Sequence, residues 1–305
     1  MPRLHRMPLT YASVAPGEVS SRRPVPATIA RPEYVDRPAP AKYTGPEVKD
    51  AETIEKMRIA GRIAAQAMAA AAAAIAPGVT TDEIDRVGHE FLLDHGAYPS
   101  TLGYRSFPKS LCTSVNEVIC HGIPSDDKIL REGDIINIDI TTILDGYFGD
   151  TSEMFAVGQI SKEAQQLIDI TRQSMWLGIL EVAPNKRIGD IGAAIVDFAS
   201  GQHRMGVVEA FCGHGIGREF HMAPQIPHVG KRGNGMRVRP GMTFTIEPMI
   251  NQGTPHCTIL DDNWTAITRD GKLSAQVEHT ILVTDDGYEV LTLRESAWRP
   301  SDARV

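Results

Sequence analysis

Apolar residues recur with helical spacing in four stretches of the chain. The first stretch ends before Pro77-Gly78, a pair that stops a helix. The second follows Thr80, which together with Glu83 has the spacing of a capping box. Proline and glycine also mark the ends of the other two. We therefore expect helices over residues 50–75, 81–96, 162–182 and 190–205.

Strand-like stretches follow each pair of helices. The clearest runs over 134–144, turns at Asp145-Gly146 and returns over 147–157, since Asp-Gly favours a two-residue hairpin turn. Shorter strands are expected over 111–115, 118–121, 207–212, 242–250, 264–268 and 274–283. Two helices followed by antiparallel strands, occurring twice, predict an α+β fold with two similar halves and argue against alternating βαβ units.

Residues 1–46 differ from the rest of the chain. They contain nine of the 20 prolines and no periodic apolar pattern. We interpret them as a Pro-rich N-terminal extension, partly polyproline II in character, ahead of one folded domain over 47–305. A strap over that domain or a plain disordered extension is favoured over a ligand for an aromatic-lined groove, because the extension contains no PxxP core. We expect it to take no part in the chemistry.

Composition and charge exclude several classes of protein. The 305 residues are 42% hydrophobic and 23% charged, and the net charge of −7 offers no attraction to nucleic acid or anionic membranes. The longest apolar run, 67–76, is shorter than the ~20 residues of a membrane span. The first 23 residues lack the apolar core of a signal peptide. Four cysteines without CxxC spacing are typical of free thiols. We expect a cytoplasmic protein with neither nucleic-acid nor membrane partners.

Carboxylates stand in strand segments, where Asp is otherwise uncommon. With the predicted turn, Thr141 faces Asp150 and Asp139 faces Ser152, so the two aspartates are diagonal neighbours on one polar face. They would repel each other unless a cation lay between them. The alternative is an exposed polar face of the sheet with solvated aspartates.

Two further acids and three histidines extend this set. Glu247 and Glu278 lie in apolar or β-branched strands, where an unpaired carboxylate is costly. Four carboxylates carry −4 and two divalent ions carry +4, which favours a dinuclear site. His214 lies in a glycine-rich segment after a strand, and His221 follows it. His121 precedes a glycine in a similar setting.

The segments that carry these residues resemble type I methionine aminopeptidases. In order along about residues 50–293 they are Asn116–Gly122, Asn137–Asp139, Gly149–Thr151, Gly213–Gly217, Phe220–His221, Thr245–Pro248 and Glu278–Thr280. The resemblance implies the pita-bread fold, with two pseudo-symmetric halves, and makes 47–305 a metallo-aminopeptidase catalytic domain. The extension resembles that of actinobacterial-type members more loosely.

The resemblance also implies two divalent metal ions. Asp150 and Glu278 would bridge them, Asp139 would complete one site, and His214 and Glu247 would complete the other. Carboxylates with one imidazole suit Mn, Fe(II) or Co, and Zn less distinctively.

Catalytic roles follow from the same resemblance. A metal-bound hydroxide would attack the peptide bond after the first residue. Glu247 would take and return a proton, His221 would stabilise the tetrahedral intermediate, and His121 would contact the leaving amide nitrogen. The side-chain pocket would be lined by Thr101, Tyr104, Phe107, Cys112, Phe220 and Trp264. Thr101 stands where many members carry Cys, and Phe107 where many carry Tyr.

The implied activity is removal of N-terminal methionine from nascent proteins and peptides when the second residue is small. Nascent chains at the ribosome would be the partners of a monomeric enzyme. The 26 positions from His221 to Glu247 leave no room for the helical insertion of type II members. A proline-specific aminopeptidase of the same fold is disfavoured because only about 50 residues precede the match. A non-catalytic pita-bread binding protein is disfavoured because all five ligand positions are filled.

Overall fold

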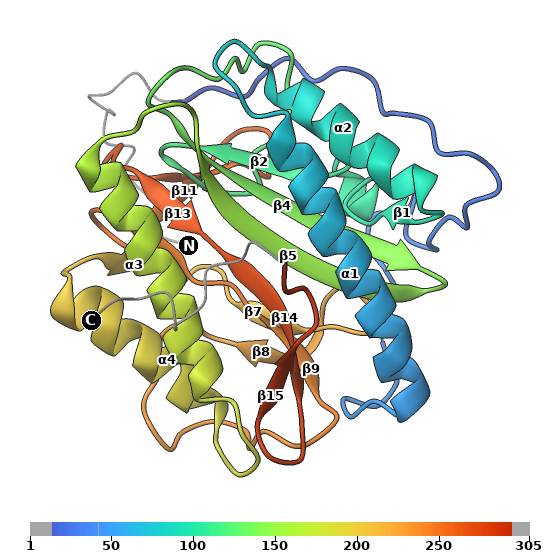
Figure 1. The fold of residues 1–305 in the computed structure, drawn as a ribbon, viewed down its shortest axis with the longest axis vertical. Helices are drawn as coiled ribbons and strands as arrows, with labels where there is room; N and C mark the ends of the chain where they lie inside the picture. The colour runs from blue at the N-terminus through green and yellow to red at the C-terminus, as the bar shows by residue number, and fades with distance from the viewer. Residues whose placement is uncertain (1–13, 42, 295–305) are drawn as a thin grey trace, which may run out of the picture.

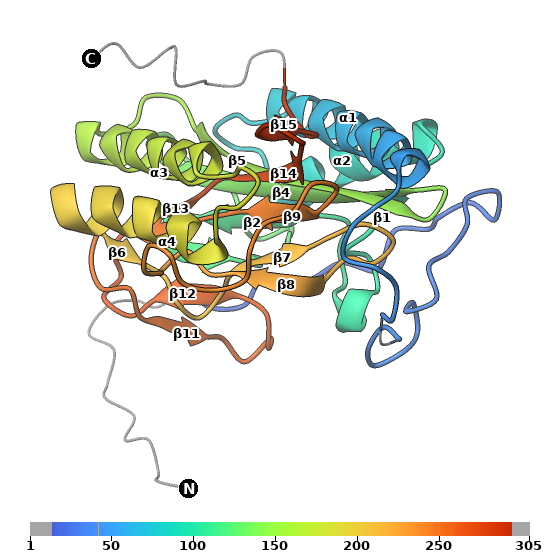
Figure 2. The ribbon, with the colours of Figure 1, turned by 90° about the horizontal axis from the view of Figure 1, so that it is seen from below.

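An antiparallel sheet of nine strands runs through the centre of the structure, and the four α-helices cover one of its faces (Figures 1 and 2). The computed structural model describes residues 14–41 and 43–294 of the chain. Helices α1 and α2 lie over one half of the sheet, and α3 and α4 lie over the other half (Figure 1). The helices are α1 (Ala51–Ala73), α2 (Thr81–Asp94), α3 (Lys162–Leu180) and α4 (Ile188–Val196), the last continued by a π-helical segment over Asp197–Gln202.

One strand pair joins the two halves of the large sheet. Its order is β1-β4-β5-β14-β9-β7-β8, with β2 beside β4 and β15 beside β14. Strand β5 of the first half pairs with β14 of the second, which places Glu278 opposite Ser152. The nine strands are β1 (Tyr98–Pro99), β2 (Cys112–Val115), β4 (Ile135–Leu144), β5 (Tyr147–Ala156), β7 (Gly213–Gly215), β8 (Met222–Ile226), β9 (Thr243–Ile246), β14 (Glu278–Val283) and β15 (Tyr288–Val290).

Two smaller sheets of three strands each complete the fold. One is formed by β13 (Ser274–Gln276), β10 (Met249–Asn251) and β6 (Gly206–Val207), and the other by β11 (Cys257–Ile259), β12 (Ala266–Thr268) and β3 (Val118–Cys120). The arrangement confirms the expected α+β architecture of two similar halves.

The local signals in the sequence predicted the helices and the central hairpin well. Leu144 pairs with Tyr147 and Thr141 pairs with Asp150, as the two-residue turn requires. Thr80 caps α2 by accepting a hydrogen bond from the backbone N–H of Glu83, at 3.2 Å. The predicted capping box is only half formed, because the Glu83 carboxylate binds Arg86 instead.

Three predicted strands are not continuous. The strand expected over 242–250 is broken after Ile246 into β9 and β10, and Pro248, which has no N–H to donate to a sheet, lies in the break. The strand expected over 274–283 is split at Val277 into β13 and β14, which belong to different sheets. Of the strand expected over 207–212, only Val207 lies in a strand, β6. Strands β1, β7, β8, β11 and β15 have no counterpart among the predictions.

Helix α1 lies very close to β5 because two glycines meet there. A Cβ atom on Gly149 would lie 2.6 Å from the backbone nitrogen of Gly61, so no larger residue fits without moving the helix. The alanine-rich run of α1 is its packing face, with Ala67 and Ala71 fully buried. Within the described residues no helix has the length and apolar character to cross a membrane. The close contact fixes the distance between α1 and β5 at Gly149. Asp150 is the next residue on β5, so its position relative to α1 is fixed as well.

The described part of the N-terminal extension is a strap across the α1–α2 half (Figure 1). Arg23 forms ion pairs with Asp82 at 2.5 Å and with Asp85 at 3.1 Å. Asp85 is fully buried and also accepts hydrogen bonds from the backbone N–H groups of Ser110 and Leu111. Through these contacts residues 14–41 lie as a strap against the folded domain; residues 1–13 and 42 lie outside the described part.

The described part of the extension contacts a predicted pocket residue at Tyr34. This side chain is 3% exposed, and its hydroxyl donates to the carbonyl oxygen of Ser100 at 2.6 Å. The edge of its ring contacts Tyr104, a predicted pocket residue, with centroids 5.1 Å apart. Single apolar residues such as Ile29 and Tyr34 carry no periodic signal, yet both are buried against the domain.

We expect the strap to contribute measurably to stability through Arg23. Replacing Arg23 with Ala removes charge-assisted hydrogen bonds to two carboxylates and should lower the free energy of unfolding by about 1.5–3 kcal/mol, as measured by urea denaturation. Arg31→Ala is the matched control, because Arg31 pairs with Asp36 on the surface and both side chains are more than half exposed. It should cost no more than about 1 kcal/mol. Equal effects from the two substitutions would contradict an anchoring role for Arg23.

Candidate active site

The floor of the site is built on the central hairpin. Asp139 on β4 and Asp150 on β5 are diagonal neighbours, because Asp139 pairs with Ser152 and Thr141 pairs with Asp150. The Thr141 hydroxyl donates to Asp150 Oδ1 at 2.7 Å and fixes that carboxylate. Glu278 on β14 lies opposite Ser152 from the other side. Three adjacent strands thus bring three acids together.

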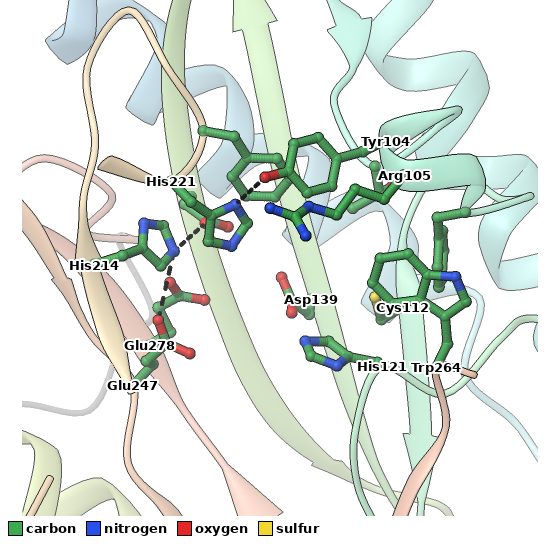
Figure 3. Close-up of a pocket in the computed structure, with 14 residues that line it drawn as sticks. Tyr104, Arg105, Cys112, His121, Asp139, His214, His221, Glu247, Trp264 and Glu278 are labelled. Atoms are coloured by element: carbon green, nitrogen blue, oxygen red, sulfur yellow. Dashed lines mark hydrogen bonds and ion pairs between the residues drawn. The ribbon is translucent and has the colours of Figure 1, made fainter. Parts of the chain in front are cut away.

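The second half of the chain contributes His214 and Glu247. Glu247 follows β9, and its Oε1 accepts a hydrogen bond from the Thr245 hydroxyl at 2.7 Å. Nε2 of His214, on β7, lies 3.6 Å from both Glu247 Oε1 and Asp150 Oδ2 (Figure 3). One ligand atom each of Asp150, His214 and Glu278 lie within 4.8 Å of one another, close enough to share one metal ion.

Three of the four carboxylates are buried and Asp139 is half-buried, with no compensating Lys or Arg beside them in the described part of the chain. Asp150 and Glu278 are only 3% and 2% exposed. Burial, together with repulsion from the neighbouring acids, raises the pKa of both carboxyl groups well above the usual range, and burial raises the pKa of Asp139 and of Glu247 as well. Among the described residues, none of the four forms an ion pair with Lys or Arg. The cluster therefore needs either protons or metal ions.

His214 is prepared to act as a neutral ligand. Burial lowers its pKa to about 4, so the imidazole is uncharged near neutral pH. Its Nδ1 lies 3.1 Å from the carbonyl oxygen of Gly215, an acceptor that places the ring proton on Nδ1. The lone pair on Nε2 then faces the carboxylates. Four carboxylates and one neutral imidazole form a donor set that suits a divalent transition ion.

A cavity of about 290 Å³ opens onto this cluster and contains all thirteen residues predicted from the sequence. His121 and His221 lie on its walls together with the predicted pocket residues Thr101, Tyr104, Phe107, Cys112, Phe220 and Trp264. One further residue, Arg105, lines the cavity and was missed. Its position in the sequence, between the predicted pocket residues Tyr104 and Phe107, could have indicated that it lies at the cavity.

The two histidines of the cavity wall are held in different ways. Nδ1 of His221 lies 3.0 Å from the Tyr104 hydroxyl. His121 has a left-handed backbone, with φ of 58°, and its ring meets Trp264 edge-on with centroids 5.8 Å apart. A left-handed backbone is costly for a residue other than glycine. The surrounding structure must therefore hold the His121 backbone in this conformation.

Comparison with known proteins agrees with this geometry. The sequence pattern of metallopeptidase family M24 matches residues 55–285. Methionine aminopeptidase 2 of Mycobacterium tuberculosis is 51% identical over 280 residues, which cover 92% of this chain and 98% of that protein. The crystal structure of methionine aminopeptidase from Rickettsia prowazekii matches with a TM-score of 0.79 and 46% identity, over 81% of this chain and 99% of that one.

The chain belongs to the methionine aminopeptidases of metallopeptidase family M24. It is a metal-dependent hydrolase with the pita-bread fold, as the sequence predicted. The prolidase of Pyrococcus horikoshii OT3 shares the fold alone, with a TM-score of 0.64 and 21% identity. The buried acids and the neutral imidazole of this methionine aminopeptidase fit the divalent metal that the family uses.

Without its metal ions, this enzyme should become less stable to unfolding as the pH rises. The four carboxyl groups have raised pKa values in the metal-free fold, whereas in the unfolded chain they titrate near pH 4. Between these values the folded state holds more protons than the unfolded state, so stability falls as pH rises. Protein stripped with chelator should therefore have a higher denaturation midpoint at pH 7 than at pH 8. This window lies above the pKa of about 6.5 of histidine in the unfolded chain, because the buried histidines have lowered pKa values and act in the opposite direction at lower pH.

The metal-loaded protein is the control for this measurement. Bound ions compensate the ionised carboxylates, so loading should restore stability at pH 8 and release protons. A stripped protein that is more stable at pH 8 than at pH 7 would contradict the burial of unpaired carboxylates.

Proposed function

We propose that the chain removes N-terminal methionine from nascent proteins and peptides whose second residue is small. The observation that carries this proposal is that the acid–imidazole cluster and an aromatic, largely apolar pocket share one cavity. A hydrolytic centre would thus lie beside a space whose aromatic lining suits an apolar first side chain. The four cysteines are free thiols, which supports action in the reducing cytoplasm. We further propose that the enzyme acts on nascent chains at the ribosome, as a monomer.

Two divalent ions, Co, Mn, Fe(II) or Zn, would be held by the five predicted ligands. Asp150 and Glu278 would bridge them; one oxygen of each lies within 4.8 Å of the other and of a ring nitrogen of His214. Asp139 would complete one ion's ligands, and His214 with Glu247 the other's. When bound, the ions would supply Lewis acidity, polarising the scissile carbonyl and lowering the pKa of water.

Glu247 would hold and move the proton of the reaction. Its Oε1 accepts from Thr245, and Gln276 Nε2 lies 3.4 Å from its Oε2, so both carboxylate oxygens are oriented by neighbours. Its backbone N–H donates to His228 Nε2 at 3.1 Å. A carboxylate held in this way can take a proton from the attacking water and deliver it to the departing amine.

The two wall histidines would act on the peptide bond. If the Tyr104 hydroxyl donates to Nδ1 of His221, the ring proton lies on Nε2 and can be donated to the scissile carbonyl oxygen. His121, held against Trp264, would contact the leaving amide nitrogen and crowd the position of the second side chain. Only small second residues would then fit.

The pocket chemistry supports methionine as the first residue. Tyr104, Phe107, Phe220 and Trp264 supply aromatic faces and edges, and sulfur–aromatic contacts favour a thioether. The Thr101 hydroxyl is already used, because it donates to the carbonyl oxygen of Lys109 at 3.1 Å. The pocket therefore offers the first side chain mostly apolar surface.

Asp150 tests the metal assignment. Asp150→Asn keeps the side-chain volume but removes the charge shared by both ions, so metal content by elemental analysis and peptidase activity should fall together. Asp145→Asn is the matched control, because Asp145 lies in the turn of the same hairpin with its side chain 71% exposed. It should keep both properties. An Asp150→Asn protein with two ions and full activity would refute the bridging role.

His221 tests the division between ligands and catalytic residues. His221→Ala should lower kcat by about 10²–10³, the usual loss for one donor to a developing oxyanion, while metal content stays unchanged. His256→Ala, at an exposed position outside the cavity, should leave kcat unaltered. Loss of an ion from His221→Ala would instead make this residue a ligand.

Substrate choice tests the pocket. Met-Ala-Ser should be cleaved, whereas Lys-Ala-Ser should not, because a charged first side chain would be desolvated without a partner at a cost of several kcal/mol. Met-Lys-Ser should fail because its second residue is large. Initial rates on the three peptides decide the matter, and rapid release of lysine, or of proline from a Pro-first peptide, would overturn methionine specificity.

A further inference from the structure

Arg105 projects into the cavity from its rim. Its guanidinium lies over the ring of Tyr104, 5.8 Å from the centroid, and Figure 3 shows it pointing into the cavity on the side of Tyr104 and His221. Arg105 is exposed, whereas the flanking pocket residues Tyr104 and Phe107 are buried. The charge therefore stands at the mouth, outside the aromatic pocket for the first side chain.

The backbone holds Arg105 in a conformation that arginine does not favour. Its φ and ψ are 45° and 38°, and Ser106 follows with φ of 70°, so two consecutive L residues are left-handed. The turn is closed by two hydrogen bonds of 2.8 Å, from Gly103 N–H to the Phe107 carbonyl and from Phe107 N–H to the Tyr104 carbonyl. Strain of this kind, held by buried neighbours, is found most often at functional sites.

Apart from its contact with the Tyr104 ring, the charge of Arg105 is left unpaired within the described part of the chain. Among the described residues Arg105 has no carboxylate within ion-pair distance, although many other surface arginines here do. If two divalent ions balance the four carboxylates of the cluster, as the proposed function requires, Arg105 is an uncompensated positive charge in the cavity. A guanidinium prefers a carboxylate partner, to which it can donate two parallel hydrogen bonds.

We propose that Arg105 is a specificity residue that binds a carboxylate side chain at the third position of the substrate. The first side chain fills the aromatic pocket, and the second must be small. The third is the first one free to reach a cation at the mouth. Peptides with Asp or Glu at this position should be cleaved faster than peptides with Lys. This proposal rests on the proposed function.

The test uses the metal-loaded, full-length enzyme and C-terminally amidated peptides Met-Ala-Xaa-Gly, with Xaa as Asp, Asn or Lys. At low salt, kcat/KM should decrease in the order Asp, Asn, Lys, with Asp about two- to fivefold above Lys, as expected for a solvent-exposed ion pair. The difference should shrink at high salt, because exposed charges are screened. Amidation removes the terminal carboxylate as a competing partner.

Variants assign the effect to Arg105. Arg105→Gln should remove the preference for Asp over Lys while still cleaving the Asn peptide, and Arg105→Lys should retain the order. Arg237→Gln removes the same charge from an exposed position outside the cavity and should behave as the wild type.

The outcomes distinguish a failure of the Arg105 proposal from a failure of the proposed methionine aminopeptidase function. Failure to cleave any Met-Ala peptide would refute the proposed function. Cleavage with no dependence on Xaa, or with a dependence that Arg105→Gln leaves intact, would overturn the role of Arg105 alone. A further result would also overturn the proposed role of Arg105: Met-Ala-Ser with a free C-terminal carboxylate is cleaved faster than its amide, while Xaa has no effect on the rate. The carboxylate that Arg105 binds would then be the C-terminus of the peptide.

Discussion

Four neighbouring carboxylates, three buried and one half-buried, that pair with no Lys or Arg in the described part of the chain are the constraint on which this structure depends. Two like unit charges 4 Å apart repel by about 4 kcal/mol at an effective dielectric constant of about 20. Asp150 and Glu278 are almost fully buried, and the one nitrogen ligand beside them, His214, is neutral. The fold therefore places its acids where only metal ions or protons can make them stable. The residues that the proposed catalysis needs are therefore the same residues that make the stability of the fold depend on bound metal or protons.

The remaining architecture serves to bring these acids together. The pairing of β5 with β14 joins the two halves and places Glu278 beside the hairpin acids. The contact between Gly61 and Gly149 sets α1 directly on β5. The strap continues this support outward, because Tyr34 contacts Tyr104, and the Tyr104 hydroxyl is hydrogen-bonded to His221. A continuous chain of contacts thus leads from the N-terminal extension to the cavity wall.

Much of the site could be predicted because its signals are local. The Asp-Gly turn fixes the pairing of Thr141 with Asp150 by counting alone, and acids within strands are unusual enough to be noticed. Features that depend on distant contacts could not be predicted. The chain leaves one sheet for another at Val277, a β-branched residue that is typical of an unbroken strand. Strand β8 alternates in burial although Pro224 lies within it. Tyr34 and Arg105 are single residues whose roles depend entirely on what the fold places beside them.

Anomalous diffraction from crystals grown with Mn²⁺ would test the central claim most directly, because it locates the ions without relying on activity. The account predicts two peaks of anomalous density inside the carboxylate cluster, with Asp150 and Glu278 lying between them and His214 beside one. Absence of any peak there, or peaks only at other acidic groups on the surface, would contradict it.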